Sequence, residues 1–299
     1  LEGDGTVVVW SGEAAGGSGW SDVVFRRFDG TGAPESGEIV AAEAGAADGL
    51  SEPAVAALPD GGFALAWTTV DLGPAGKDVH ALRFDADGLP VGNPTLLSAS
   101  TKGMQVSPAL AALEDGTLAA AWQTQLVPGE TLELYARLFD PLGAPLTGDL
   151  EVNPLHDGNE RLASLDSCGS GGFVICWQDD VADGDGSGAL GRGIDPLGGF
   201  PFAASLVNGW TEGNQFGASC ACRPDLEFAA VSPGDFEGGT QGVALQLFDT
   251  MEDPSPVGAP VMLSGLDNLA GKWQLDAAAF AAGGFVAVWD SLGPGADAS

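Results

Sequence analysis

One ten-residue pattern recurs along the chain, and its spacing limits what the chain can fold into. A turn rich in Asp and Gly precedes a short apolar run that ends in tryptophan, as in GGFALAWTTV at 61–70. A weaker copy at 224–233 has Val231 or Ser232 in the tryptophan place. Repeats of this length predict a fold built from stacked copies of one unit. The five tryptophans, with one repeat skipped before the last, are Trp10, Trp67, Trp122, Trp177 and Trp289.

A second marker keeps the same register. An Asp preceded by Phe or Ile follows each strand that we place third in the repeat, and we interpret it as the start of an Asx turn and not as a catalytic group. Each complete repeat then reads as four strands, A to D, joined by tight turns. The marker pairs are Phe28-Asp29, Phe84-Asp85, Phe139-Asp140, Ile194-Asp195 and Phe248-Asp249.

Strand B indicates how the copies pack. In FALAW, the side chains of Phe63, Leu65 and Trp67 point to one face of the strand. The small Ala64 and Ala66 point to the other face, so both faces are apolar and both must be covered. We therefore predict an all-β chain, a β-propeller of four-stranded antiparallel blades with about 55 residues per repeat and five or six blades. A β-solenoid is the alternative.

The repeats divide a single predicted domain, 1–299, unevenly. The approximate boundaries are 1–48, 49–102, 103–157, 158–212, 213–265 and a partial repeat at 266–299. This division contains six B strands but five of each other type. The surplus strand is compatible with a five-bladed ring, with an open or six-bladed fragment, or with a filament in which the strand joins a neighbouring subunit.

The charge of the chain excludes several kinds of partner. The net charge is −32, with 42 acidic residues against 10 Lys and Arg, so nucleic acid and anionic lipid would be repelled. No run of 18 apolar residues exists, which predicts no membrane insertion. Such a surface attracts cations, so we expect either a solvated acidic coat or a requirement for Ca²⁺.

The four cysteines predict the compartment. Cys168 and Cys176 lie close together in the sequence, as do Cys220 and Cys222, without a C-x-x-C motif or a nearby histidine. This disfavours zinc and covalent haem and favours disulfides in a secreted, extracellular or cell-surface protein. Three pairings are possible, and buried free thiols are the alternative. The position of Leu1 just before a strand suggests a processed or excised N-terminus.

The pattern P-x-V-A-A-L-x-D-G-G-F-x-x-x-W, followed by x-A-x-R-F-D-x-x-G-x-P, resembles a tandem repeat of large secreted bacterial surface proteins. The resemblance spans nearly the whole chain. It implies a propeller-like extracellular module and no particular activity. The copy near Cys220 departs most from the pattern, because it lacks the tryptophan.

Two segments are candidate sites. The segment DDVADGDGSG at 179–188 spaces oxygen ligands in a glycine-rich loop, as a Ca²⁺ site would, although a plain hairpin loop reads the same way. Trp20 and Trp210 lie in predicted loops at the same end of the blades and could stack on sugars, although loop tryptophans also serve as anchors. The candidate metal ligands are Asp179, Asp180, Asp183, Asp185 and Ser187.

These observations predict a function without catalysis. We find no catalytic residues and no cofactor motif, and we expect a structural or adhesive extracellular module, a possible filament or surface-assembly subunit. Its partners would be further copies of itself, other surface proteins or glycans. The alternative is a glycan-binding, lectin-like propeller or a glycoside-active enzyme.

Overall fold

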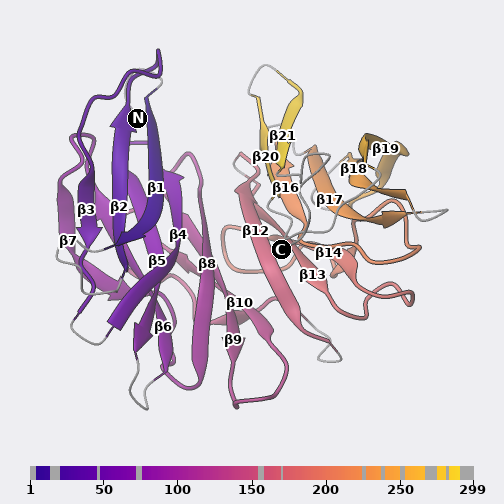
Figure 1. Cartoon of the computed structure of the whole chain (residues 1–299), viewed down its shortest axis with the longest axis horizontal. Helices are drawn as coiled ribbons and strands as arrows, with labels where there is room; N and C mark the ends of the chain where they lie inside the picture. The colour runs from indigo at the N-terminus through magenta and orange to yellow at the C-terminus, as the bar shows by residue number, and fades with distance from the viewer. Residues whose placement is uncertain are drawn as a thin grey trace. The chain divides into compact units, whose positions relative to one another are not determined.

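The structure is a computed structural model of the chain, and every regular element among the residues it describes is a β-strand (Figure 1). The described residues are 5–13, 21–45, 48–71, 76–153, 158–169, 171–223, 227–236, 240–249, 253–266, 275–280 and 283–289. The strands form six antiparallel sheets. No helix within these ranges could span a lipid bilayer. The chain divides into two compact units, residues 1–130 with 134–151, and residues 131–133 with 152–299.

The first unit holds three sheets, of three, four and four strands. Strand order within each sheet follows the sequence, as in the predicted four-stranded meander. The strands are β1 (Thr6–Glu13), β2 (Ser21–Phe28), β3 (Ile39–Ala42), β4 (Asp48–Ala57), β5 (Phe63–Asp71), β6 (Lys77–Phe84), β7 (Pro90–Leu96), β8 (Met104–Ala112), β9 (Leu118–Gln125), β10 (Glu133–Phe139) and β11 (Leu150–Glu151).

The second unit holds sheets of four, four and two strands, and the first residue of β10 also belongs to it. The tally of described strands matches the predicted one, with an incomplete copy at each end of the chain. The strands are β12 (Glu160–Ser167), β13 (Phe173–Asp179), β14 (Gly188–Ile194), β15 (Ser205–Leu206), β16 (Ser219–Cys222), β17 (Phe228–Phe236), β18 (Thr240–Phe248), β19 (Pro256–Leu266), β20 (Leu275–Ala279) and β21 (Phe285–Trp289).

The repeated Asp residues start turns, as predicted. Asp29 Oδ1 accepts hydrogen bonds from the backbone N–H groups of Thr31 at 2.8 Å and Ala33 at 2.9 Å. These bonds close the C–D turn without any other group, so the repeated Asp needs no catalytic explanation. The same Oδ1 contact to turn amides recurs at Asp85, Asp140, Asp195 and Asp249.

The sheets pack face to face within each unit, because strand B is buried on both sides. In the first unit, Phe63, Leu65 and Trp67 belong to one buried cluster. Ala64 and Ala66 belong to the next cluster along the chain. The A strands of successive sheets are neighbours, as β4 and β8 are in the first unit and β12 and β16 are in the second.

The strand register identifies the residue that replaces the repeated tryptophan in the sheet of β16–β19. Trp177 lies four residues after Phe173, which pairs with Ile194 of the marker. In the following sheet Phe228 pairs with Phe248 of the marker, so Ser232 takes the tryptophan place.

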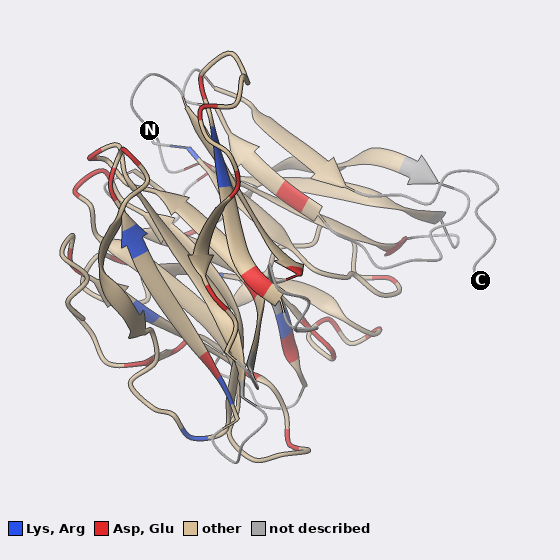
Figure 2. Ribbon diagram, turned by 60° about the vertical axis from the view of Figure 1, so that its left-hand side comes forward, with Lys and Arg blue, Asp and Glu red and all other residues tan. Residues whose placement is uncertain are grey.

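The charges are distributed by element. Figure 2 shows many acidic residues on turns and loops, whereas most Lys and Arg segments lie on strands. Two arginines on the third strand of a repeat pair with acidic side chains: Arg27 is 3.3 Å from Glu35, and Arg83 contacts Asp60. Three others donate to backbone carbonyls instead: Arg26 to Ser36, Arg137 to Thr147 and Arg192 to Val152.

Candidate functional site

Three carboxyl groups meet at one end of the sheets in the second unit. In a meander of four strands, strand A starts, strand B ends and strand C starts at the same end. Glu160 begins β12 and pairs in register with Asp179, which ends β13, so both side chains point to the same face. Glu133, the first residue of β10, is close enough for its charge to raise the pKa of Glu160. We call Glu133, Glu160 and Asp179 the carboxyl cluster.

The cluster is buried. Glu160 has no exposed surface, and Glu133 and Asp179 are 9% and 2% exposed. Asn153 Nδ2 donates to Glu133 Oε2 at 2.5 Å, and the backbone N–H of Val181 donates to Asp179 Oδ1 at 2.7 Å. Neither carboxyl oxygen of Glu160 accepts a hydrogen bond from a described residue. Glu133 and Asp179 each accept a hydrogen bond, whereas Glu160 has no such donor to stabilise a charge.

The electrostatics follow from this arrangement. Burial, and then the negative charges of Glu133 and Asp179, raise the pKa of Glu160 to about 9. At neutral pH Glu160 therefore carries a proton while its two neighbours accept hydrogen bonds. A proton held beside carboxylates is the arrangement that general acid–base chemistry requires.

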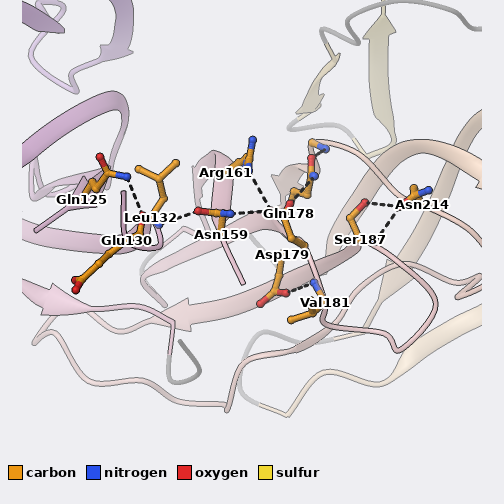
Figure 3. Close-up of polar contacts among 12 residues, drawn as sticks. Gln125, Glu130, Leu132, Asn159, Arg161, Gln178, Asp179, Val181, Ser187 and Asn214 are labelled. Carbon is orange, nitrogen blue, oxygen red and sulfur yellow. Dashed lines mark hydrogen bonds and ion pairs between the residues drawn. The ribbon is translucent and has the colours of Figure 1, made fainter. Parts of the chain in front are cut away.

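A polar rim, made of Asn159, Arg161, Gln178 and Asp180, lies where β12 begins and β13 ends, and Figure 3 labels the first three with Asp179. Arg161 is 3.0 Å from Asp180 Oδ2, and Asn159 Nδ2 donates to the same oxygen at 3.0 Å. Gln178 pairs with Arg161 in register, and its side-chain oxygen accepts from the backbone N–H of Gly217 at 3.0 Å. These side chains are the hydrogen-bonding kinds that proteins use for sugar hydroxyls.

Side chains of the predicted calcium loop form hydrogen bonds with other groups of the protein. Asp183 Oδ1 accepts from the Asp185 backbone N–H at 3.1 Å, and Asp185 Oδ2 accepts from the Gly213 N–H at 3.1 Å. Ser187 Oγ donates to the carbonyl of Gln215 at 2.9 Å. In the part of the chain that is described, no three Asp, Glu, His or Cys side chains are arranged to hold a metal. Binding of Ca²⁺ at Asp179, Asp180, Asp183, Asp185 and Ser187 stays a prediction.

The predicted tryptophan pair is only partly visible. Trp20 lies outside the described residues. Trp210 is half-buried in the loop after β15, where its carbonyl accepts a hydrogen bond from Asn208 Nδ2 at 2.7 Å. The same amide donates to Gln215 and, at 3.4 Å, to Asp183, so the Trp210 loop is tied to the 179–188 loop.

One predicted disulfide forms. Cys168 is bonded to Cys222, which links the sheet of β12 to the sheet of β16. Cys176 and Cys220 are buried free thiols, so the two alternatives of the sequence both occur. Burial, with the neighbouring Cys220, raises the pKa of the Cys176 thiol well above its usual value.

Known proteins resemble this chain in fold and not in sequence. No family model and no curated protein matches the chain. Solved structures do match, and several of them are enzymes that act on glycans. The α-L-arabinanase of Penicillium chrysogenum, complexed with arabinobiose, is 14% identical with a TM-score of 0.54, covering 79% of this chain and 74% of that one.

Two further structures show the same fold. The GH93 α-L-arabinofuranosidase of Fusarium graminearum, also with arabinobiose, is 11% identical with a TM-score of 0.53, covering 76% of this chain and 70% of that one. A protein of unknown function from Dyadobacter fermentans is 12% identical with a TM-score of 0.58, covering 86% and 76%. At these identities the likeness concerns the fold.

This comparison overturns our prediction of a non-catalytic structural or adhesive module that is not an enzyme. The prediction treated a repeated sheet fold as a scaffold, whereas the fold is shared with arabinanase and arabinofuranosidase enzymes. The predicted roles in adhesion and in a filament are overturned together with it.

The sequence analysis also missed the carboxyl cluster. In so acidic a chain a pair of carboxylates carries little information, and Glu133 is distant from Glu160 in the sequence. One signal was available: repeat alignment places Glu160 where the preceding copy has Gln105, at a position that the strand pattern buries.

Proposed function

We propose that the chain is a glycan-active enzyme of the β-propeller class, which hydrolyses glycosidic bonds at the carboxyl cluster. The observation that carries this proposal is the burial of Glu160, with no hydrogen bond from a described residue to its carboxyl oxygens, near Glu133 and Asp179, which raises its pKa to about 9. The fold likeness to arabinanase and arabinofuranosidase structures supports the substrate class, and glycans with arabinofuranosyl units are the first candidates.

The roles follow from charge. Glycoside hydrolysis uses one carboxylic acid to protonate the leaving oxygen and one carboxylate to activate water or attack the sugar. Glu160 holds the proton at neutral pH, so it is the acid. Asp179 and Glu133 are the candidates for the carboxylate, and together with burial their nearness keeps Glu160 protonated. Because Glu160 has no exposed surface, a sugar can reach its proton only if the side chains that cover it are displaced.

The polar rim supplies the sugar contacts. Asn159, Arg161 and Asp180 form a connected set of donors and acceptors beside the cluster. Trp210 belongs to a loop that is tied to 179–188, and it offers an aromatic surface for sugar stacking. In a propeller, the loops at this end of several blades share one rim.

The finer features of the fold belong to this proposal. Five or six blades of about 55 residues surround one axis, with the A strands innermost, and the adjacency of successive A strands within each unit supports this. The Cys168–Cys222 disulfide supports export to an oxidising compartment, where the protein meets polysaccharides.

The test is hydrolysis of a panel of glycans. Linear and branched arabinan, arabinoxylan and aryl glycosides, including 4-nitrophenyl α-L-arabinofuranoside, are incubated with the protein, and released reducing sugar or nitrophenol is measured. We expect turnover of at least one arabinofuranosyl substrate, and a loss of about 10²-fold or more in Glu160→Gln, which keeps the shape and removes the acid.

Glu114→Gln is the matched control, because Glu114 is exposed in a hairpin turn and lies outside the cluster. It should retain full activity. Silence of the folded protein on the whole panel, or a Glu160→Gln variant as active as the parent, would reject the proposal.

A further inference from the structure

The first unit contains two packing layers between sheets, and equivalent repeat positions can be compared in them. The first layer lies between the β1–β3 and β4–β7 sheets, and the second between the β4–β7 and β8–β11 sheets. Alignment on Phe28, Phe84 and Phe139 makes Phe25 equivalent to Ala81.

Three aromatic rings fill the first layer. Phe25 contacts Phe63 and Phe84 edge-on, with ring centroids 5.2 and 5.1 Å apart. Phe63 and Phe84 stack with centroids 5.0 Å apart. All three side chains are buried, and Phe25 has no exposed surface.

The second layer lacks two of these three rings. Ala81 stands in the place of Phe25, and Leu118 stands in the place of Phe63, while Phe139 keeps the place of Phe84. A cavity of about 160 Å³ lies at this point, and Ala81, Leu118 and Phe139 line it, with Leu97 and Ala64. The ring that Phe25 supplies in the first layer is therefore absent, and Phe139 is the only aromatic residue among the described residues that line the cavity.

The second unit shows that such a loss can be repaired. There Gly191 takes the place of Phe25, and Phe202 enters from the loop after β14 to lie 6.5 Å from Phe228. Phe228 in turn stacks on Phe248 at 4.7 Å. The layer with Ala81 has no such replacement among the residues that line its cavity.

The mouth of the cavity can admit a ligand. Val91 and Leu142 line it, and they are 50% and 88% exposed. Asn93 and Thr95 on β7 are exposed in the lining, so an amide and a hydroxyl stand beside the apolar wall. The strongly acidic surface disfavours anions.

We propose that this cavity is a binding site for a small, uncharged aromatic compound with one ring and a polar substituent, such as a phenol. The ring takes the place that Phe25 fills in the first layer, against Phe139, and the substituent reaches Asn93 and Thr95. Its size suits this ligand, because an engineered apolar cavity of about 150 Å³ binds benzene. The proposal does not depend on the proposed function.

The experiment uses 4-fluorophenol and the whole chain. Fluorine NMR of the ligand, titrated with protein, gives the dissociation constant for the parent and for Ala81→Phe, which restores the missing ring. We expect saturable binding to the parent, at least about tenfold weaker binding to Ala81→Phe, and a higher Tm for that variant because it fills the cavity. Ala33→Phe, on an exposed turn, is the matched control and should bind as the parent does.

Circular dichroism establishes that each variant is folded. If Ala81→Phe is not folded, Leu118→Phe takes its place, because it restores the other missing ring. Absence of saturable binding to the parent would overturn the proposal, as would equal affinity of the parent and a folded cavity-filling variant.

Discussion

The same three positions carry different chemistry in two successive repeats. In the second unit they hold Glu133, Glu160 and Asp179. One repeat earlier, in the first unit, the equivalents are Asp78, Gln105 and Thr124, and Gln105 pairs with Thr124 in the register in which Glu160 pairs with Asp179. Gln105 and Glu160 are equally buried, at 1% and 0% exposed.

The difference teaches that the sheet supplies a position and the side chain supplies the reactivity. Gln105 donates its amide to the carbonyl of Lys102 at 2.7 Å and cannot carry a charge. Glu160 has no such partner in the described part of the chain, and it keeps a proton because it is buried and because Glu133 and Asp179 are close to it. Equivalent positions therefore hold a neutral, hydrogen-bonded amide in the first unit and a proton-bearing carboxyl group in the second.

The largest effect is expected from converting the second unit toward the first. Asp179→Thr installs the residue of the preceding repeat, and a β-branched residue suits the strand. We expect kcat/KM on the arabinofuranosyl substrate to fall by about 10²- to 10³-fold. Removing a neighbouring negative charge also lowers the pKa of Glu160, so the alkaline limb of the pH–rate profile moves to lower pH.

The pH profile separates this outcome from simple misfolding. A variant with reduced activity but an unshifted alkaline limb would show that Asp179 does not act through Glu160. An unchanged kcat/KM would remove Asp179 from the site.

The sequence predicts the fold because the repeat carries redundant information. The spacing of Trp67 and Trp122, the turn Asp that follows each C strand, and the two apolar faces of strand B agree with one another. Each is a local or periodic property, so a single sequence expresses it. The strand order, the Asx turns and the incomplete copies at both ends follow from these alone.

The carboxyl cluster is not predictable in the same way. Glu133 and Glu160 meet only because residues from different sheets approach each other, and the pKa of Glu160 depends on burial that no local pattern states. The disulfide partner of Cys168 is likewise a matter of sheet neighbours, since Cys222 is 54 residues away.

The disulfide provides the next contrast, because the described residues of the first unit contain no cysteine. Cys168→Ala with Cys222→Ala should lower the free energy of unfolding by about 2–4 kcal/mol, since the crosslink no longer restrains the unfolded chain. Urea unfolding with and without dithiothreitol measures this. Reductant should destabilise the parent and leave the double variant unchanged, and equal responses of the two would contradict the assignment.

The pH dependence of stability gives the third test. The pKa of Glu160 is about 9 when folded and near 4.5 when unfolded, so between these values the folded state holds a proton that the unfolded state has released. Stability therefore falls as pH rises through this window, by an amount on the order of 2 kcal/mol. Glu160→Gln should flatten the urea midpoint between pH 5 and pH 9.

The reverse substitution completes the comparison. Gln105→Glu places an acid beside Asp78 and removes the amide donor, so we expect a loss of about 1–3 kcal/mol at pH 8 and a smaller loss at pH 5. A pH-independent loss would show that the first unit cannot hold a protonated acid at this place.

The smallest effect is expected from chelation. The side chains of the 179–188 loop already make hydrogen bonds within the protein, as Asp183 does with Asn208 and the Asp185 backbone, so Ca²⁺ adds little order. We expect EDTA to lower Tm by about 1–2 °C, and Asp183→Ala to remove this response. A fall of many degrees would mean that the loop is held by the ion and not by its own hydrogen bonds. No fall at all would remove Ca²⁺ from this loop and leave its acidic residues as turn formers, as Asp29 and its equivalents are in the other repeats.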